Sequence, residues 1–195
     1  MKTIKTIVTV LIFTVICSGL INAQTKPVKR LAAPYFTIAP TGGILFPVGQ
    51  LGDNLRPGPS LGLDLGYRIN KEVGVYGKVG FSFMNSKTDG IPSGRYVEFS
   101  AGPRYYMTKP NLSSTLFLEA GVGAYQFNRE GYNFGVIPVP EVNDTKIGVN
   151  GGIGANLALT KTIDIMIKAK YHSVFTEGGS SSFITALGGI EFKLK

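Results

Sequence analysis

The chain has 195 residues, including 26 Gly, 12 Phe and 9 Tyr, with no Trp and one Cys. This length suits a single domain, and the abundance of Gly and aromatic residues with few Leu/Ala/Glu/Lys runs excludes a mainly helical protein. The net charge of +8 comes without a cluster of basic residues interleaved with aromatic ones, so we expect no nucleic-acid partner.

The first element is an export signal over residues 1–23. Two lysines precede an apolar stretch over 7–17, and a more polar tail follows, which is the arrangement of a secretory signal peptide. The apolar stretch is too short for a membrane anchor, and Ile16 is not the small residue that a lipoprotein signal needs before Cys17. We expect cleavage before Gln24, which would remove the only Cys and leave 18 basic against 12 acidic residues.

The remainder, 24–195, is interpreted as one domain of alternating segments. Apolar and polar residues alternate over 34–47, 58–69, 72–84, 95–107, 115–127, 146–158, 162–175 and 182–194. Alternation with a period of two predicts antiparallel β-strands. Most segments have 12 to 14 residues, whereas globular strands average about 5 to 6 and a tilted membrane strand needs roughly 9 to 11. Their length favours a barrel that crosses a membrane.

The connections between these segments alternate in length. The first, third, fifth and seventh are VGQLGDNLRPGP, NSKTDGIPSGR, NREGYNFGVIPVPEVNDT and TEGGSSS, and the second, fourth and sixth are NKE, TKPNLSST and TKT. Long loops at one end and short turns at the other are typical of bacterial outer-membrane barrels whose termini are periplasmic.

The fifth connection, 128–145, is the most distinctive. Its aromatic and apolar residues indicate either a binding loop or a plug folded over the barrel mouth. The candidate interaction residues are Tyr132, Phe134, Ile137 and Pro138.

Apolar and charged side chains fall on opposite faces of the predicted strands. One face carries apolar residues such as Leu63, Val79, Phe99 and Ile165, and we expect no charge on it. A slip of one residue would exchange the two faces, so the segregation is well specified. On the other face, the charges that we expect to form a buried, paired network are Asp64, Lys78, Glu98, Arg104, Glu119, Lys168 and Glu191.

Alternation alone does not say which face is inside, because a soluble lipocalin exchanges the two faces. The polar face is rich in Gly and its charges nearly balance, which suits a crowded lumen. Aromatic residues also gather toward strand ends, as in the girdles at the two interfaces of a bilayer: Tyr35, Tyr67, Phe83, Tyr105, Tyr106, Phe117, Phe127, Tyr171 and Phe192. We therefore expect the apolar face to contact lipid.

No catalytic residue, cofactor or metal site is expected. His172 is followed by Ser173, but adjacent residues of a strand point to opposite faces, so they cannot form a nucleophile and its base. Asp53 and Asp89 lack EF-hand spacing and are interpreted as turn formers. The interior of an eight-stranded barrel is just wide enough for side chains to fill it, so a freely conducting pore is not expected.

Three segments of the chain resemble the small outer-membrane β-barrel proteins of Gram-negative bacteria. The segments are FPVGQLGDNLRPGPSLGLDLGYRINKEVGVYGKVGF, FLEAGVGAYQF and ALGGIEFKL. These barrel proteins form the OmpA/OmpX-like superfamily, which includes opacity-type, porin-like proteins. The resemblance covers nearly all of 24–195 and implies an all-β, eight-stranded, antiparallel up-and-down transmembrane β-barrel in the cell outer membrane. It also implies contacts with outer-membrane lipid and lipopolysaccharide, the barrel-assembly machinery, periplasmic chaperones and an unknown extracellular partner.

The chain departs from this family at its end, FKLK, where Phe192 lies three positions before the last residue instead of an aromatic residue closing the last strand. We expect no peptidoglycan-binding domain after the last strand, and hence no tether to the cell wall. We expect a structural or surface-interaction role without enzymatic activity. One alternative is a secreted lipocalin-like binder of a small hydrophobic ligand, which needs an apolar lumen. The other is an outer-membrane lipid-modifying enzyme, which needs a polar triad near a rim.

Overall fold

The computed structural model describes residues 28, 30–88, 90–108, 114–134, 137–177 and 179–195. The predicted export signal over 1–23 lies outside these residues. Among the described residues, no helix has the length and hydrophobicity that crossing a membrane would require.

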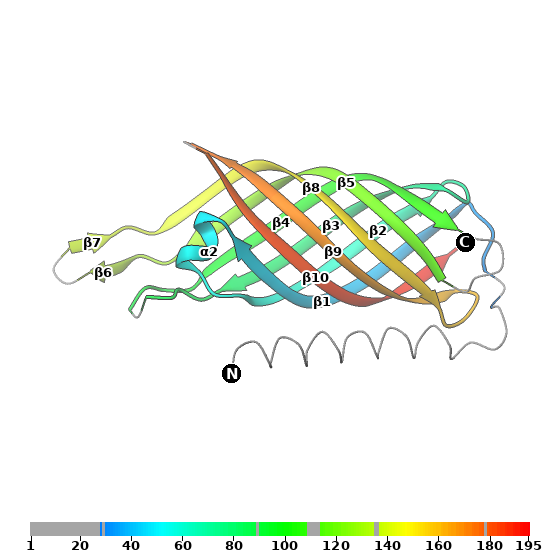
Figure 1. The fold of residues 1–195 in the computed structure, drawn as a ribbon, viewed down its shortest axis with the longest axis horizontal. Coiled ribbons are helices and arrows are strands. Elements are labelled where there is room, and N and C mark those ends of the chain that lie inside the picture. Colours follow the sequence, from blue (N-terminus) through cyan, green and yellow to red (C-terminus); the bar gives the residue numbers. More distant parts are fainter. Residues whose placement is uncertain (1–27, 29, 89, 109–113, 135–136, 178) are drawn as a thin grey trace.

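Eight long strands close into one antiparallel barrel (Figure 1). Each strand pairs with the strands before and after it around the barrel, and the first pairs with the last. The predicted eight-stranded up-and-down topology is therefore confirmed. The strands are β1 (Tyr35–Val48), β2 (Gly58–Arg68), β3 (Val73–Met84), β4 (Gly94–Thr108), β5 (Ser114–Arg129), β8 (Val142–Ala158), β9 (Ile163–Thr176) and β10 (Gly179–Leu194).

Three short elements lie at one end of the barrel. They are α2 (Gln50–Asn54), β6 (Tyr132–Phe134) and β7 (Ile137–Val139). We call this the loop end, and the opposite end, with the β2–β3 and β8–β9 turns and the C-terminus, the turn end (Figure 1). Leu51 in α2 and Leu55 just after it pack against apolar side chains inside the barrel.

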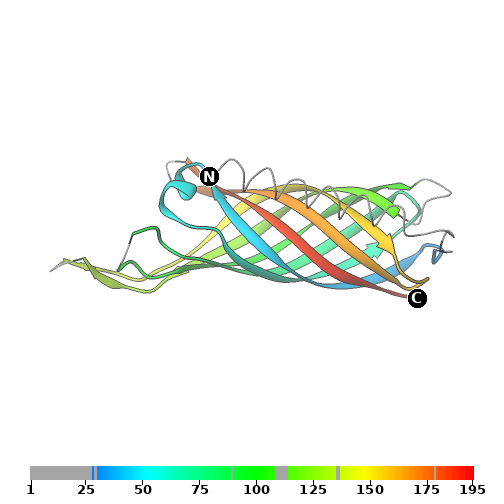
Figure 2. The ribbon, with the colours of Figure 1, turned by 60° about the horizontal axis from the view of Figure 1, so that its bottom comes forward.

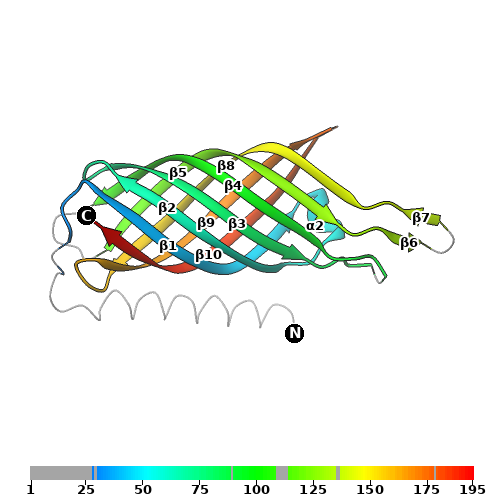
Figure 3. The same ribbon diagram turned by 180° about the vertical axis from the view of Figure 1, so that it is seen from behind.

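The fifth connection is a ribbon that continues two barrel strands. The β5–β8 ladder runs to the pair Arg129 and Val142, and β6 then pairs with β7. In all three ribbon views (Figures 1, 2 and 3) this hairpin extends away from the barrel and does not fold over its mouth. The plug alternative is therefore wrong.

The seventh connection is much shorter than the predicted loop, TEGGSSS. The β9–β10 ladder continues through Ser181 opposite Val174 to Gly179 opposite Thr176, so Thr176 and residues 179–182 of the predicted loop belong to the two strands. Ser and Gly favour loops in isolation, but pairing with an apolar neighbouring strand overrides that preference.

Alternate side chains point out of the barrel and into it. Outward-facing Leu63 and Phe99 are 40% and 54% exposed, whereas inward-facing Asp64 and Glu119 are 3% and 4% exposed. The interior thus lacks the apolar lumen that a lipocalin-like binder needs. Arg95 is an exception to the charge-free outer face: it is exposed near the loop end of β4, opposite Phe83.

Part of the predicted aromatic girdle is wrong. Tyr105 and Tyr171 are each 49% exposed on the outer face. Tyr35, Tyr106 and Phe117 instead point inward, with at most 4% exposure. Each of these three has the parity of the inward-facing residues of its own strand, so parity is a better guide to orientation here than nearness to a strand end.

The outward orientation predicts how charge affects insertion. Leu63→Arg, at the middle of β2, should lower the free energy of unfolding in lipid vesicles by about 2 to 4 kcal/mol, because a charge is most costly at mid-bilayer. The measurement is a urea titration followed by heat-dependent gel mobility. Ile69→Arg, just beyond the end of β2, is the control and should cost about 0 to 1 kcal/mol. Equal losses for the two variants would contradict the orientation.

A close approach of β4 and β5 makes a second prediction. At Gly102 an added Cβ would overlap the carbonyl oxygen of Ala120, whereas at Gly188 it would meet only one atom, at 3.9 Å. Gly102→Ala should lower the free energy of unfolding by about 1 to 3 kcal/mol through overpacking. Gly188→Ala should leave it unchanged in the same titration, and an equal response of the two variants would show that the close approach is absent.

Candidate functional site

A cluster of buried apolar side chains lies toward each end of the barrel interior. The loop-end cluster consists of Leu45, Met84, Tyr96, Tyr125, Val174 and Phe183. The turn-end cluster consists of Ala39, Tyr106, Phe117 and Met166. Rings pack within both, since Tyr96 and Phe183 have centroids 5.3 Å apart and Tyr106 and Phe117 6.0 Å apart.

Arg104 is the hub of the charges in the interior. Its Nη2 and Nε lie 2.6 and 2.9 Å from Oε2 of Glu119. Its guanidinium also lies 3.6 Å from Asp64 and 3.9 Å from Glu191. The guanidinium covers the ring of Phe117 at 4.5 Å, so the hub packs directly against the turn-end cluster.

Lysines from β3 and β9 extend this network. Lys168 contacts Asp64 and lies 3.5 Å from Glu119, and Lys78 lies 2.7 Å from Glu98. Asp64 and Lys168 come from β2 and β9, which are not neighbours in the barrel, so this ion pair joins two separate parts of the wall.

One residue outside the predicted network connects its two halves. Lys170 lies 3.4 Å from Glu119 and 3.7 Å from Glu98. With it, all seven predicted network residues are buried and belong to one connected set. Lys170 has the same parity as Lys168 in β9, so the sequence pattern identified its face but not its contacts.

A chain of hydrogen bonds crosses the interior beside these charges. The Lys170 ammonium donates to Tyr76, at 3.4 Å, and the Tyr76 hydroxyl donates to Asn150, at 2.7 Å. The Asn150 amide donates in turn to Tyr125, at 3.0 Å. Because these residues belong to β9, β3, β8 and β5, the chain reaches across the lumen, an arrangement that strand alternation alone does not predict.

His172 extends this chain. Its ring nitrogens lie 3.1 Å from the hydroxyls of Tyr125 and Thr185, and its Nδ1 lies 3.8 Å from Glu98. The hydroxyl of Thr185, the imidazole of His172 and the carboxylate of Glu98 thus lie in a row, but none of these three side chains is more than 5% exposed. The ring also stacks on Phe183, with centroids 4.5 Å apart, so other side chains enclose the imidazole.

Further polar contacts fill the turn end. Lys193 donates to Asp164 at 2.6 Å, and Arg30, before β1, donates to the backbone oxygen of Asn156 at 3.1 Å. Arg68 covers the ring of Tyr106 at 3.9 Å. Among the described residues, no group of three or more His, Cys, Asp and Glu side chains is placed to hold a metal ion.

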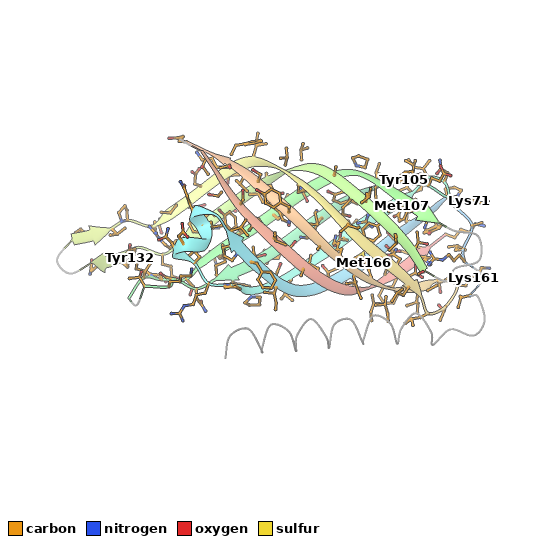
Figure 4. All side chains as sticks on the ribbon, viewed as in Figure 1. Lys71, Tyr105, Met107, Tyr132, Lys161 and Met166 are labelled. Carbon is orange, nitrogen blue, oxygen red and sulfur yellow. The ribbon has the colours of Figure 1, made fainter. Side chains whose placement is uncertain are left out.

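The candidate interaction residues lie on the β6–β7 hairpin, far from this network. Tyr132 is half-buried beneath the guanidinium of Arg129, 5.3 Å from its ring, and Pro138 is exposed; Figure 4 labels Tyr132 on the projecting ribbon. The side chains of Phe134 and Ile137 lie outside the described part of the structure.

Solved outer-membrane proteins share this architecture. Neisserial surface protein A is 16% identical, with 85% of this chain and 100% of that chain covered and a TM-score of 0.62. A major outer membrane protein of Thermus thermophilus is 15% identical, with 83% and 100% covered and a TM-score of 0.59. OprG of Pseudomonas aeruginosa is 12% identical, with 86% and 99% covered and a TM-score of 0.58.

At these identities the likeness concerns the fold alone. No curated protein matches the sequence. The family model described as the outer membrane protein beta-barrel domain matches residues 13–190, which is most of the chain and includes all strands of the barrel up to β10. The protein therefore belongs to the outer membrane protein beta-barrel family.

Proposed function

We propose that this protein is a structural barrel of the outer membrane that neither conducts nor catalyses, and that it presents the β6–β7 hairpin as an interaction element. The observation that carries the proposal is the filled interior. Among the described residues, five buried carboxylates face six buried lysines and arginines there, and ion pairs between them join strands that are not neighbours in the wall.

A permeating solute would have to break this packing at several levels. It would meet the ring stack of His172 and Phe183 at the loop end, then the ion pairs around Arg104, then the turn-end cluster. Removing one partner of a buried ion pair leaves the other charge uncompensated, at a cost of roughly 3 to 5 kcal/mol. A closed lumen is the low-energy state of such an interior.

Two features support a role without catalysis. The hydroxyl, imidazole and carboxylate around His172 are enclosed by other side chains, and Ser173 lies on the opposite face of β9, as alternation requires. The lipid-modifying alternative needs a polar triad at an accessible rim, and the one histidine of the sequence, His172, is buried and cannot supply its base there.

The orientation in the membrane follows the usual arrangement of bacterial barrels, with short turns and termini in the periplasm. The turn end then faces the periplasm, and α2 and the β6–β7 hairpin face outward. In this orientation a signal peptide over 1–23, periplasmic chaperones and the barrel-assembly machinery would bring the chain to the membrane, and lipopolysaccharide would surround the loop end.

The projecting hairpin suits contact with an extracellular partner. Its two strands pair only with each other, so their outer edges are open to another strand. Pro138 and Pro140 interrupt one edge, since proline has no N–H to donate and thereby discourages uncontrolled strand pairing. The edge formed by β6 contains no proline and is the one that we propose binds a partner.

A closed lumen predicts that the barrel does not conduct ions. Purified protein in a planar lipid bilayer should give no stepwise conductance, because its interior ion pairs and ring stacks leave no continuous water path. If current steps do occur, Lys78→Gln tests whether the ions pass through the lumen, because a substitution at a lumen residue would alter the size or ion selectivity of such steps. Reproducible steps from the wild type that change in Lys78→Gln would contradict the proposal.

The network predicts a large stability effect at its hub. Arg104→Met should lower the free energy of unfolding in detergent by about 3 to 5 kcal/mol, because Glu119 loses its closest buried counter-charge and Asp64 keeps only Lys168. Lys146→Met, which removes two ion pairs at the surface, is the control and should leave the urea midpoint unchanged. Adding Glu119→Gln to Arg104→Met should restore part of the loss, since the two residues are coupled. A small effect of Arg104→Met would show that the network does not stabilise the barrel.

A further inference from the structure

The outer wall of the barrel is hollowed near the turn end. Two apolar hollows, of about 900 and 380 Å³, lie on the lipid-facing side of β1 to β4. They share Leu65, Gly77 and Ala101, so they join into one groove, which we call the wall groove. Figure 3 shows the strands β2, β3 and β4 that form its floor.

Small side chains in adjacent strands create the wall groove. Gly77 lies opposite Leu65 in β2 and opposite Ala101 in β4, so two neighbouring outward positions carry a hydrogen and a methyl group. An added Cβ at Gly77 would meet only the carbonyl oxygen of Ser100, at 4.0 Å. Larger residues flank these positions: Phe36 and Tyr67 toward the turn end, where their rings lie 4.6 Å apart, and Phe99 toward the middle of the barrel.

Two lysines and one acid lie near the turn-end limit of the wall groove. Lys195 lines it, and Lys71 is exposed in the turn between β2 and β3, whose strands form the floor (Figure 4). Glu72 is the exposed acid beside Lys71. Tyr67 and Tyr105, on β2 and β4, are the aromatic residues that such barrels place at the membrane interface.

We propose that the wall groove holds one acyl chain of an anionic phospholipid from the leaflet at the turn end, with its phosphate between Lys71 and Lys195. The lining is apolar, so its shape suits a methylene chain. It offers no hydrogen-bonding groups to a polar ligand. The groove begins at the interface and runs toward the bilayer centre, which is the path of an acyl chain. The two lysines complement a negatively charged headgroup.

A second copy of the chain fits this surface less well. The wall around the groove is the convex outside of a barrel, and two copies of a concave groove do not fill each other. Lipid tails are as apolar as the groove, so burial alone gives no preference for staying there. The preference must come from packing in the hollow and from charge, and each lysine near a lipid surface contributes about fivefold to binding.

The test is native mass spectrometry of the full-length barrel, released from detergent with equal amounts of phosphatidylglycerol and phosphatidylcholine. The wild type should retain one phosphatidylglycerol molecule in preference to phosphatidylcholine. Gly77→Leu should lose that molecule, because its side chain occupies the groove. Lys71→Gln and Lys195→Gln should each reduce the preference for phosphatidylglycerol by about fivefold.

Matched controls lie elsewhere on the same barrel. Gly188→Leu places the same side chain at an equally open outward glycine outside the groove, and Lys161→Gln removes a turn-end lysine from the β8–β9 turn. Both should behave as the wild type, and all variants should keep the heat-dependent gel mobility of a folded barrel. Equal retention by Gly77→Leu and wild type, equal retention of the two lipids by wild type, or a dimer that Gly77→Leu abolishes would each overturn the proposal.

Discussion

The structure depends on one constraint: inside hydrocarbon, backbone N–H and C=O groups must all find partners within the protein. A closed barrel meets this constraint because every strand has two neighbours and no edge remains. Closure then decides the side chains. Those that point outward must be apolar, and those that point inward must fill a narrow tube, so the strict alternation along each strand follows from the backbone requirement.

The interior of this barrel contains buried charges where the core of a soluble protein contains apolar side chains, so its contribution to stability needs an explanation. Buried ion pairs often contribute less to stability than apolar packing of the same volume would. Here the charges form one connected set around Arg104, with Lys170 joining its halves, so each buried carboxylate in that set faces at least one base. An interior of this kind fixes which strands face one another across the tube, because a shift in register would separate the partners.

The same alternation of side chains explains how much of this structure can be predicted from the sequence. Alternation determines orientation residue by residue, so the strands and the inward placement of residues such as Glu98 and Lys168 can be predicted. Contacts across the lumen cannot, because they depend on the stagger between strands, and the hydrogen-bond chain through Tyr76 and Asn150 is of this kind. Composition alone makes TEGGSSS a loop, although most of it pairs with β9. Nearness to a strand end predicts that Tyr106 lies on the outer face, whereas its parity in β4 correctly predicts that it points inward.

The most direct measurement of the orientation uses spin labels. Residues 24–195 contain no Cys, so each introduced Cys carries the only label. Labels at Leu63, Val79 and Phe99 should collide often with oxygen, which dissolves in hydrocarbon, and rarely with a water-soluble nickel complex. Labels at the inward positions Ser82 and Thr185 should collide rarely with both. If the outward labels are shielded from oxygen while the inward ones are open to the nickel complex, the apolar face is a core and the account is wrong.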